Sequence, residues 1–326
     1  MTLLYITHGS NDFIDDMLFL GLPNLKDDYD IYFAISGCEF GFPKNISERS
    51  ANIFYTWKND WINAANSLKD INDFPDVKID ICIIGQAWDQ NQNRFFELKN
   101  QLNDNAQILQ VYSLDENGPQ VPIRTSPHHI FYTNKEIQWD SKYYLPFISP
   151  PSLVLKENTS EIKYFLNCQL GNTHECRFPT VNKFLSAVSE IGKQDSSLIS
   201  CWGNVMFGNT ERTPTEKYWD ILEQTKCIVH ERGAGTDAFR FWESIATGNY
   251  VLCSQRNYFA VNGMPIPPNV IFWNDNTDLP NLLRSIDNIS FDNLLALRKD
   301  SKEFIKQYHL PEARLRRILS CDCFHT

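Results

Sequence analysis

The chain has 326 residues, with 30 Lys and Arg against 40 Asp and Glu, which gives a net charge of −10. This length suggests two domains, and the 42% hydrophobic content supplies enough apolar side chains for two cores. Intrinsic disorder is therefore excluded as the main state. The acidic balance also argues against a nucleic-acid partner, because phosphate binding needs a clustered positive surface.

The sequence pattern lacks the marks of targeting, membrane insertion and disulfide bonding. No apolar run approaches the roughly 20 residues of a membrane span, and the first residues lack the basic region of a signal peptide. The nine cysteines include no Cys-x-x-Cys pair, which argues against a zinc or redox motif. These features predict a cytoplasmic protein with no transmembrane segment.

Short apolar segments alternate with amphipathic ones through the first half of the chain. The predicted strands lie at 3–7, 31–35, 79–84 and 108–112. The predicted helices lie at 11–22, 57–68 and 94–102. Strands and helices that alternate in this way are typical of a parallel sheet with right-handed crossovers.

Three prolines, Pro146, Pro150 and Pro151, interrupt the alternation and indicate a linker. Beyond them, strands are predicted at 162–166, 198–202, 227–230 and 250–253. Helices are predicted at 180–191, 215–224, 237–247, 291–308 and 311–319. The alternation therefore restarts after the linker, as it would in a second domain of the same kind.

This pattern predicts an α/β fold with two doubly wound Rossmann-like domains and an interdomain cleft. The first domain would span 1–150 and the second 151–302. The remaining residues, 303–326, would form a C-terminal helix that packs back towards the first domain. In such sheets a ligand binds outside the carboxyl ends of the strands, so candidate site residues are sought there.

The segment from Cys227 to Gly248 carries the clearest chemical signal, because it predicts a strand, a glycine turn and a helix. Gly233 and Gly235 allow a tight turn and a close approach to a ligand, and the start of the helix favours phosphate. Arg240 and Glu243 lie one turn apart on the same face. Arginine suits a diphosphate, and a carboxylate suits ribose hydroxyls. The alternative is a turn without a ligand, followed by a surface ion pair.

The run Arg232-Gly-Ala-Gly-Thr-Asp-Ala-Phe-Arg240-Phe-Trp-Glu243, followed by Gly248-Asn-Tyr-Val-Leu, resembles the donor-site segment of a group of bacterial and viral glycosyltransferases. These are the spore-maturation-protein-like and exostosin-like members of the two-Rossmann-domain class, GT-B. More loosely, 12–22 resembles their first helix and 308–319 their closing helix. The resemblance is specific near 227–253, whereas about 40 to 160 matches no motif of the group.

The resemblance implies a hexosyl- or pentosyltransferase that takes a sugar from a nucleotide-sugar donor, with a UDP-sugar favoured. The second domain would hold the donor, and the first a saccharide or lipid-linked glycan acceptor. The nucleotide-sugar is a co-substrate, and neither a cofactor nor a metal is expected, so arginines and a helix start must neutralise the diphosphate. The implied donor-binding residues are Arg177, His230, Arg232, Gly233, Ala234, Gly235, Thr236, Asp237, Arg240 and Glu243. For Arg177, placed in the loop 167–178, an ordinary loop arginine is the alternative.

An inverting transfer to a hydroxyl needs a general base, which we expect in the first domain. His8 and Asp12 flank the first strand–helix turn and have the required chemistry. The alternatives are a turn histidine and a carboxylate that interacts with the helix dipole. Asp89 and Arg94, near the next such turn with Trp88, are expected to contact the acceptor.

Two other functions stay open at this point. One is a non-catalytic subunit that binds a nucleotide or a sugar phosphate without turnover. The other is a phage-type glycosyltransferase that modifies DNA, for which Arg314, Arg316 and Arg317 would supply a local basic strip. The net charge of −10 argues against the second. Nucleotide release with and without an acceptor separates the enzyme from the binding subunit.

Overall fold

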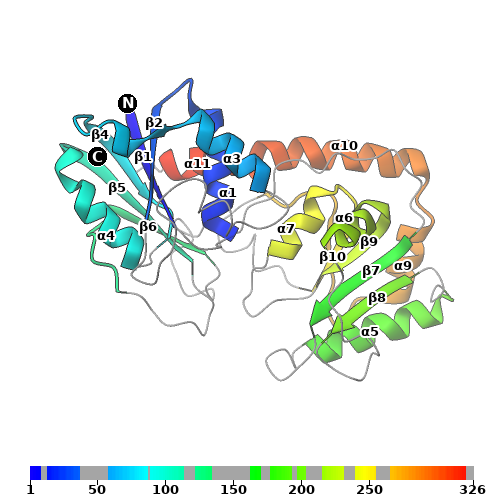
Figure 1. Ribbon diagram of the computed structural model, residues 1–326. Coiled ribbons are helices and arrows are strands. Elements are labelled where there is room, and N and C mark those ends of the chain that lie inside the picture. Colours follow the sequence, from blue (N-terminus) through cyan, green and yellow to red (C-terminus); the bar gives the residue numbers. More distant parts are fainter. Residues whose placement is uncertain are drawn as a thin grey trace. The chain divides into compact units, whose positions relative to one another are not determined.

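A computed structural model shows the chain folded into two compact units (Figure 1). The first unit comprises Met1–Pro151 and His309–Thr326, and the second comprises Ser152–Tyr308. The structure describes residues 1–8, 13–36, 58–86, 89–113, 122–133, 162–169, 177–192, 197–202, 215–230, 239–254 and 265–320. The acceptor and donor roles of the two units remain predictions.

The first unit is built on a six-stranded sheet in the order β3-β2-β1-β4-β5-β6, with every pair parallel. Its strands are β1 (Thr2–Thr7), β2 (Asp30–Ile35), β3 (Lys69–Asp70), β4 (Ile79–Ile84), β5 (Leu102–Ser113) and β6 (His129–Thr133). This is the strand order of a dinucleotide-binding Rossmann sheet. The chain reverses its direction of travel between β1 and β4, and ligands of such sheets bind beyond the carboxyl ends of those strands.

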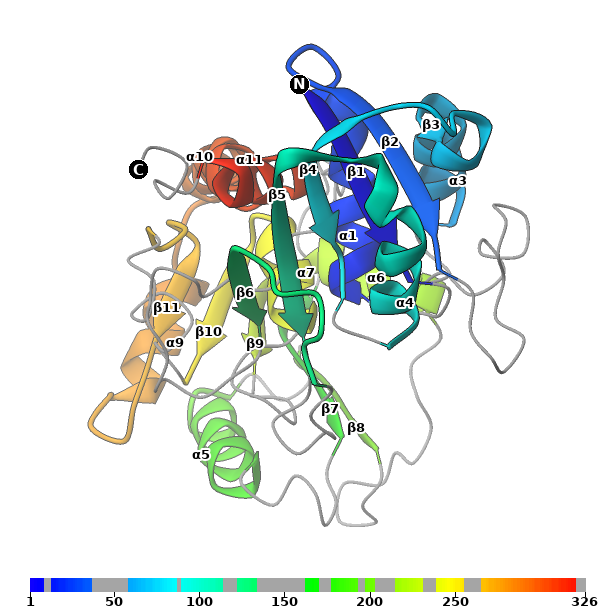
Figure 2. The ribbon, with the colours of Figure 1, turned by 90° about the vertical axis from the view of Figure 1, so that its left-hand side faces the viewer.

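Helices cover both faces of this sheet (Figure 2). They are α1 (Phe13–Gly21), α3 (Lys58–Ser67) and α4 (Asp89–Leu98), with 3₁₀ turns at η1 (Leu22–Leu25), η4 (Ile71–Asp73) and η5 (Lys99–Gln101). On one face, the ring of Phe19 in α1 lies 6.1 Å from that of Tyr5 in β1 and 4.6 Å from that of Trp61 in α3. On the other face, Phe95 of α4 packs with Leu4, the strand neighbour of Tyr5. Alternate strand residues therefore face different helices, as a doubly wound sheet requires.

The second unit has a five-stranded sheet in the order β11-β10-β9-β7-β8, again with parallel pairs. Its strands are β7 (Ile162–Gln169), β8 (Ser197–Trp202), β9 (Thr225–His230), β10 (Tyr250–Cys253) and β11 (Val270–Phe272). Counted within the unit this order is 2-1-3-4-5, the flavodoxin-like arrangement, so the switch point lies between β7 and β9. The carboxyl ends of these two strands therefore mark the ligand position in this unit.

Five helices described in this unit are α5 (Arg177–Glu190), α6 (Thr215–Gln224), α7 (Phe239–Ala246), α9 (Leu279–Asp287) and α10 (Phe291–Tyr308). Tyr164 of β7 packs against Phe184 of α5 and Leu283 of α9. The next residue, Phe165, packs against Leu222 of α6 on the opposite face. The second sheet is thus also covered on both sides.

The last helix, α11 (Pro311–Leu319), belongs to the first unit and packs on α1. Arg316 of α11 donates a hydrogen bond to Asp28 at 2.6 Å. Between the sheet, α3 and α11, helix α1 is buried on nearly every side, and its two carboxylates, Asp15 and Asp16, are buried together with its apolar residues.

We expect Gly21→Ala to destabilise the first unit. A Cβ at Gly21 would lie 2.6 Å from the carbonyl carbon of Pro311 and 2.7 Å from the amide nitrogen of Glu312, both backbone atoms that cannot rotate away. Overpacking of this kind costs about 1–3 kcal/mol. Urea unfolding should show a lower midpoint with an unchanged slope. An unchanged midpoint would mean that α11 does not press on α1 as described.

The structure corrects several predicted boundaries. The helix expected at 94–102 is α4, which begins earlier at Asp89, where a carboxylate favours a helix start. Leu102 instead begins β5, which is longer than the expected 108–112 because its polar residues 103–105 hide the strand. The helix expected at 180–191 begins at Arg177, since Pro179 is tolerated in a first turn. Arg177 is therefore in a helix and not in a loop. The short strands β3, β6 and β11 and the helix α9 were not predicted.

Candidate functional site

The candidate donor site lies at the switch point of the second unit. His230 is the last residue of β9, Arg177 is the first residue of α5, which follows β7, and Arg240 and Glu243 belong to α7, which follows β9. The segments that carry these residues thus leave the two strands that flank the switch point. The turn itself lies outside the described residues: Arg232, Gly233, Ala234, Gly235, Thr236 and Asp237. The side chains of Arg177 and Arg240 also lie outside them.

His230 is held at the end of β9 by strand pairing and by an aromatic contact. It pairs in register with Cys253 of β10, and its ring centroid lies 5.0 Å from that of Phe241 in α7. The side chain is buried. This contact packs the end of β9 against the first turn of α7.

Glu243 is the second side chain of the candidate site that the structure describes. It is 4% exposed, and its Oε2 accepts a hydrogen bond from the hydroxyl of Tyr218 in α6 at 3.1 Å. Burial of a carboxylate is costly unless donors compensate it. Such a group is not half of a solvent-exposed ion pair, so the surface-pair alternative is wrong for Glu243.

In the first unit, His8 directly follows β1 and is buried. Asp12 lies outside the described residues. The backbone N–H of His8 donates to Oδ2 of Asp15 at 2.5 Å, and the hydroxyl of Thr7 donates to the same oxygen at 3.0 Å. The hydroxyl of Tyr5 donates to the other oxygen, Oδ1, at 2.8 Å. A fully buried carboxylate therefore fixes the last residues of β1 and the position of His8.

Asp15 also reaches the neighbouring strand at the switch point of this unit. A Cβ at Gly85, just after β4, would lie 2.1 Å from Oδ1 of Asp15 and 2.5 Å from the hydroxyl oxygen of Tyr5. Only glycine leaves room for this carboxylate. Asp15 was not predicted as a site residue, although the sequence carries one signal for it: Tyr5 and Thr7 place two hydroxyls on one face of a buried strand, where they need an acceptor.

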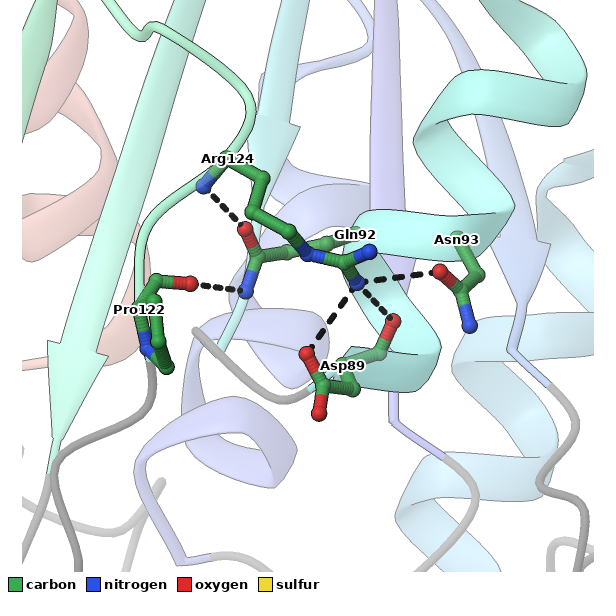
Figure 3. A network of polar contacts seen from close by, with 5 residues as sticks. All are labelled: Asp89, Gln92, Asn93, Pro122 and Arg124. Atoms are coloured by element: carbon green, nitrogen blue, oxygen red, sulfur yellow. Dashed lines mark hydrogen bonds and ion pairs between the residues drawn. The ribbon is translucent and has the colours of Figure 1, made fainter.

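The residues after β4 form a polar network within the first unit (Figure 3). The guanidinium of Arg124 donates to Oδ1 of Asp89 and to the side-chain oxygen of Asn93, each at 3.0 Å. The side-chain oxygen of Gln92 accepts a hydrogen bond from the backbone N–H of Arg124 at 2.6 Å, and its side-chain nitrogen donates to the carbonyl of Pro122 at 2.9 Å. Asp89 thus ties α4 to the chain that leads into β6. Trp88 lies outside the described residues.

The arginines named from the sequence differ in their surroundings. Arg94 donates to Glu97 at 2.6 Å and to Asn72, so it links parts of the first unit, and its contact with an acceptor stays a prediction. Arg314 is fully buried and bonded to His309 at 2.8 Å, and Arg316 pairs with Asp28. These arginines therefore do not form an exposed basic strip.

Among the residues described, no three His, Cys, Asp or Glu side chains are grouped as metal ligands would be. Within those ranges, no helix combines the length and apolar character needed to cross a bilayer.

No protein-family model and no curated protein matches the sequence. Solved structures do match its fold. AviGT4, a glycosyltransferase involved in avilamycin A biosynthesis, is similar over 98% of both chains, with a TM-score of 0.50 and 11% identity. Sucrose-phosphate synthase from Thermosynechococcus elongatus aligns over 100% of this chain and 98% of its own, with a TM-score of 0.43 and 9% identity. Glycosyltransferase VinC in complex with dTDP aligns over 98% and 99%, with a TM-score of 0.39 and 13% identity.

The likeness to AviGT4 extends over both units, and at this identity it shows the fold. Together with the two parallel sheets covered on both faces, it confirms the predicted α/β class. The chain has the architecture of two doubly wound Rossmann-like units found in GT-B glycosyltransferases.

Proposed function

We propose that this protein is a glycosyltransferase that transfers a hexose or pentose from a nucleotide-sugar, with a UDP-sugar favoured, to a hydroxyl of a saccharide or lipid-linked glycan. The second unit binds the donor, and the first binds the acceptor. The transfer inverts the configuration at the anomeric carbon of the sugar and needs no metal. Among GT-B enzymes, the chain belongs with the spore-maturation-protein-like and exostosin-like group.

The observation that carries this proposal is the buried Glu243, one turn into the helix that follows β9. Gly233 and Gly235 precede this helix in the sequence, and its second residue is Arg240. A helix start and arginines favour a diphosphate, and a carboxylate one turn later suits ribose hydroxyls. The switch-point position of β7 and β9 agrees with a ligand at this edge of the sheet.

In the first unit, His8 and Asp12 are the proposed catalytic residues. His8 stands at the carboxyl end of β1, beside the other switch point, and Asp15 holds its backbone. One of the two removes the proton from the acceptor hydroxyl as the sugar transfers. The nucleoside diphosphate is the leaving group. Arg177, Arg232 and Arg240 neutralise its negative charge in place of a metal.

The test begins with nucleotide binding. Nucleoside diphosphates with each base are added to the protein, and the shift in Tm is measured. A true donor nucleotide at 100 times its Kd stabilises the fold by about 2.7 kcal/mol, and we expect uridine diphosphate to give the largest shift. The protein is then incubated with the matching nucleotide-sugar and saccharide acceptors, in the presence of a metal chelator, and the released nucleotide is measured.

Release that rises with an acceptor and persists in the chelator supports the whole proposal. Nucleotide binding without release on any acceptor supports the non-catalytic subunit instead. If none of the nucleotides shifts the Tm, the donor-site assignment is wrong.

A further inference from the structure

Tyr218 projects from α6 to the candidate donor site, although nothing in the sequence pattern marked it. Its hydroxyl donates to Oε2 of Glu243 at 3.1 Å. The ring packs against the core of the second unit, 6.1 Å from the ring of Phe165 and 5.5 Å from that of Trp219. A phenol whose ring is held by the core is a rigid donor, because only two side-chain torsions place its hydroxyl.

The bond matters because Glu243 is a long side chain in a buried place. Three torsions set where a glutamate carboxylate lies, and a donor that is held by the core restricts them. The carboxylate can accept about four hydrogen bonds, so a bond from Tyr218 is compatible with ribose hydroxyls that donate to the same group. A hydrogen bond to a charged acceptor in a buried site is also stronger than a neutral one.

We propose that Tyr218 is a positioning residue that orients the Glu243 carboxylate towards the ribose of the donor, and so makes this site selective for ribonucleotides over deoxyribonucleotides. The inference rests on the proposed function. The competing role for the same bond is purely structural, as a link between α6 and α7.

The experiment compares nucleotide affinities in Tyr218→Phe, which removes one oxygen and keeps the ring. Tyr164→Phe is the matched control, because the buried Tyr164 hydroxyl also makes a 3.1 Å hydrogen bond in this unit, to the carbonyl of Leu283. For each protein, calorimetry gives the Kd for uridine diphosphate and for its 2′-deoxy and 3′-deoxy analogues. The ratio of deoxy to ribo Kd reports the hydroxyl contacts alone.

In the wild type we expect at least one analogue to bind about tenfold or more weakly, as loss of a hydrogen bond to a charged group predicts. Tyr218→Phe should reduce this ratio to about threefold or less, and Glu243→Gln should reduce it similarly. Tyr164→Phe should keep the wild-type ratio even if its Tm falls.

A wild-type ratio retained in Tyr218→Phe overturns the inference and leaves the bond as a structural link. A wild-type protein that binds all three nucleotides equally overturns it as well, while donor binding itself stands. If uridine diphosphate and the other nucleoside diphosphates fail to bind at all, the proposed function and the inference fall together.

Discussion

Replacement of Asp15 by alanine should remove much of the stability of the first unit. The change leaves three donors without this carboxylate: the hydroxyls of Tyr5 and Thr7 and the backbone N–H of His8. A buried donor that loses its acceptor costs about 1–3 kcal/mol, so we expect a loss of about 3 kcal/mol or more. That is a large share of the roughly 5–15 kcal/mol that stabilises a typical domain. Urea unfolding measures the loss directly.

Asp27→Ala is the matched control, because it makes the same chemical deletion at an exposed position just after η1. Its free energy of unfolding should stay within about 0.5 kcal/mol of the wild type. Asp15→Asn keeps the shape, but one amide hydrogen-bond donor would then face other donors, so an intermediate loss is expected. Equal stability of Asp15→Ala and Asp27→Ala would contradict the role described for Asp15.

Arg240→Ala should lower kcat by about 100- to 1000-fold, the usual effect of removing one preorganised charge from a site where negative charge develops. Arg240 is the second residue of α7 and lies one turn before the buried Glu243. If it contacts the diphosphate, its contribution grows as the bond to the sugar breaks. The loss should therefore appear in kcat and not only in KM. Steady-state kinetics with the nucleotide-sugar measures both.

Arg284→Ala is the control for this variant. Arg284 is a half-exposed arginine of α9 in the same unit and pairs with Glu190 at 3.3 Å. Its removal should leave kcat and KM at wild-type values, because an exposed pair contributes only about 0–1 kcal/mol to stability. Wild-type kcat in Arg240→Ala would remove Arg240 from the donor site.

The fold followed from apolar patterning wherever strands are buried on both faces. The strand predicted at 79–84 is β4 without change, and the helices predicted at 291–308 and 311–319 are α10 and α11. Prediction failed where polar residues lie in a strand. β9 begins at Thr225, two residues earlier than expected, because the amine of Lys226 donates to the carbonyl of Asp287 at 2.5 Å and so permits burial of this lysine.

The candidate site was predictable only in part, for a similar reason. Gly233, Gly235 and the spacing of Arg240 and Glu243 are local patterns, so they can be found in the sequence alone, and their role in a donor site stays a prediction. The partner of Glu243 is Tyr218, 25 residues earlier on another helix, and no periodicity relates the two. Asp15 was likewise hidden, because an acidic residue in a first helical turn is ordinarily explained by the helix dipole.

In the proposed mechanism, the nucleotide-sugar binds between the end of β9 and the start of α7. This is tested by a crystal structure of the protein with uridine diphosphate, or with whichever nucleoside diphosphate gives the largest Tm shift. We expect the diphosphate at the start of α7, beyond the carboxyl ends of β7 and β9, with a ribose hydroxyl within hydrogen-bond distance of Glu243. A nucleotide bound at the first unit, or away from α7, would contradict it.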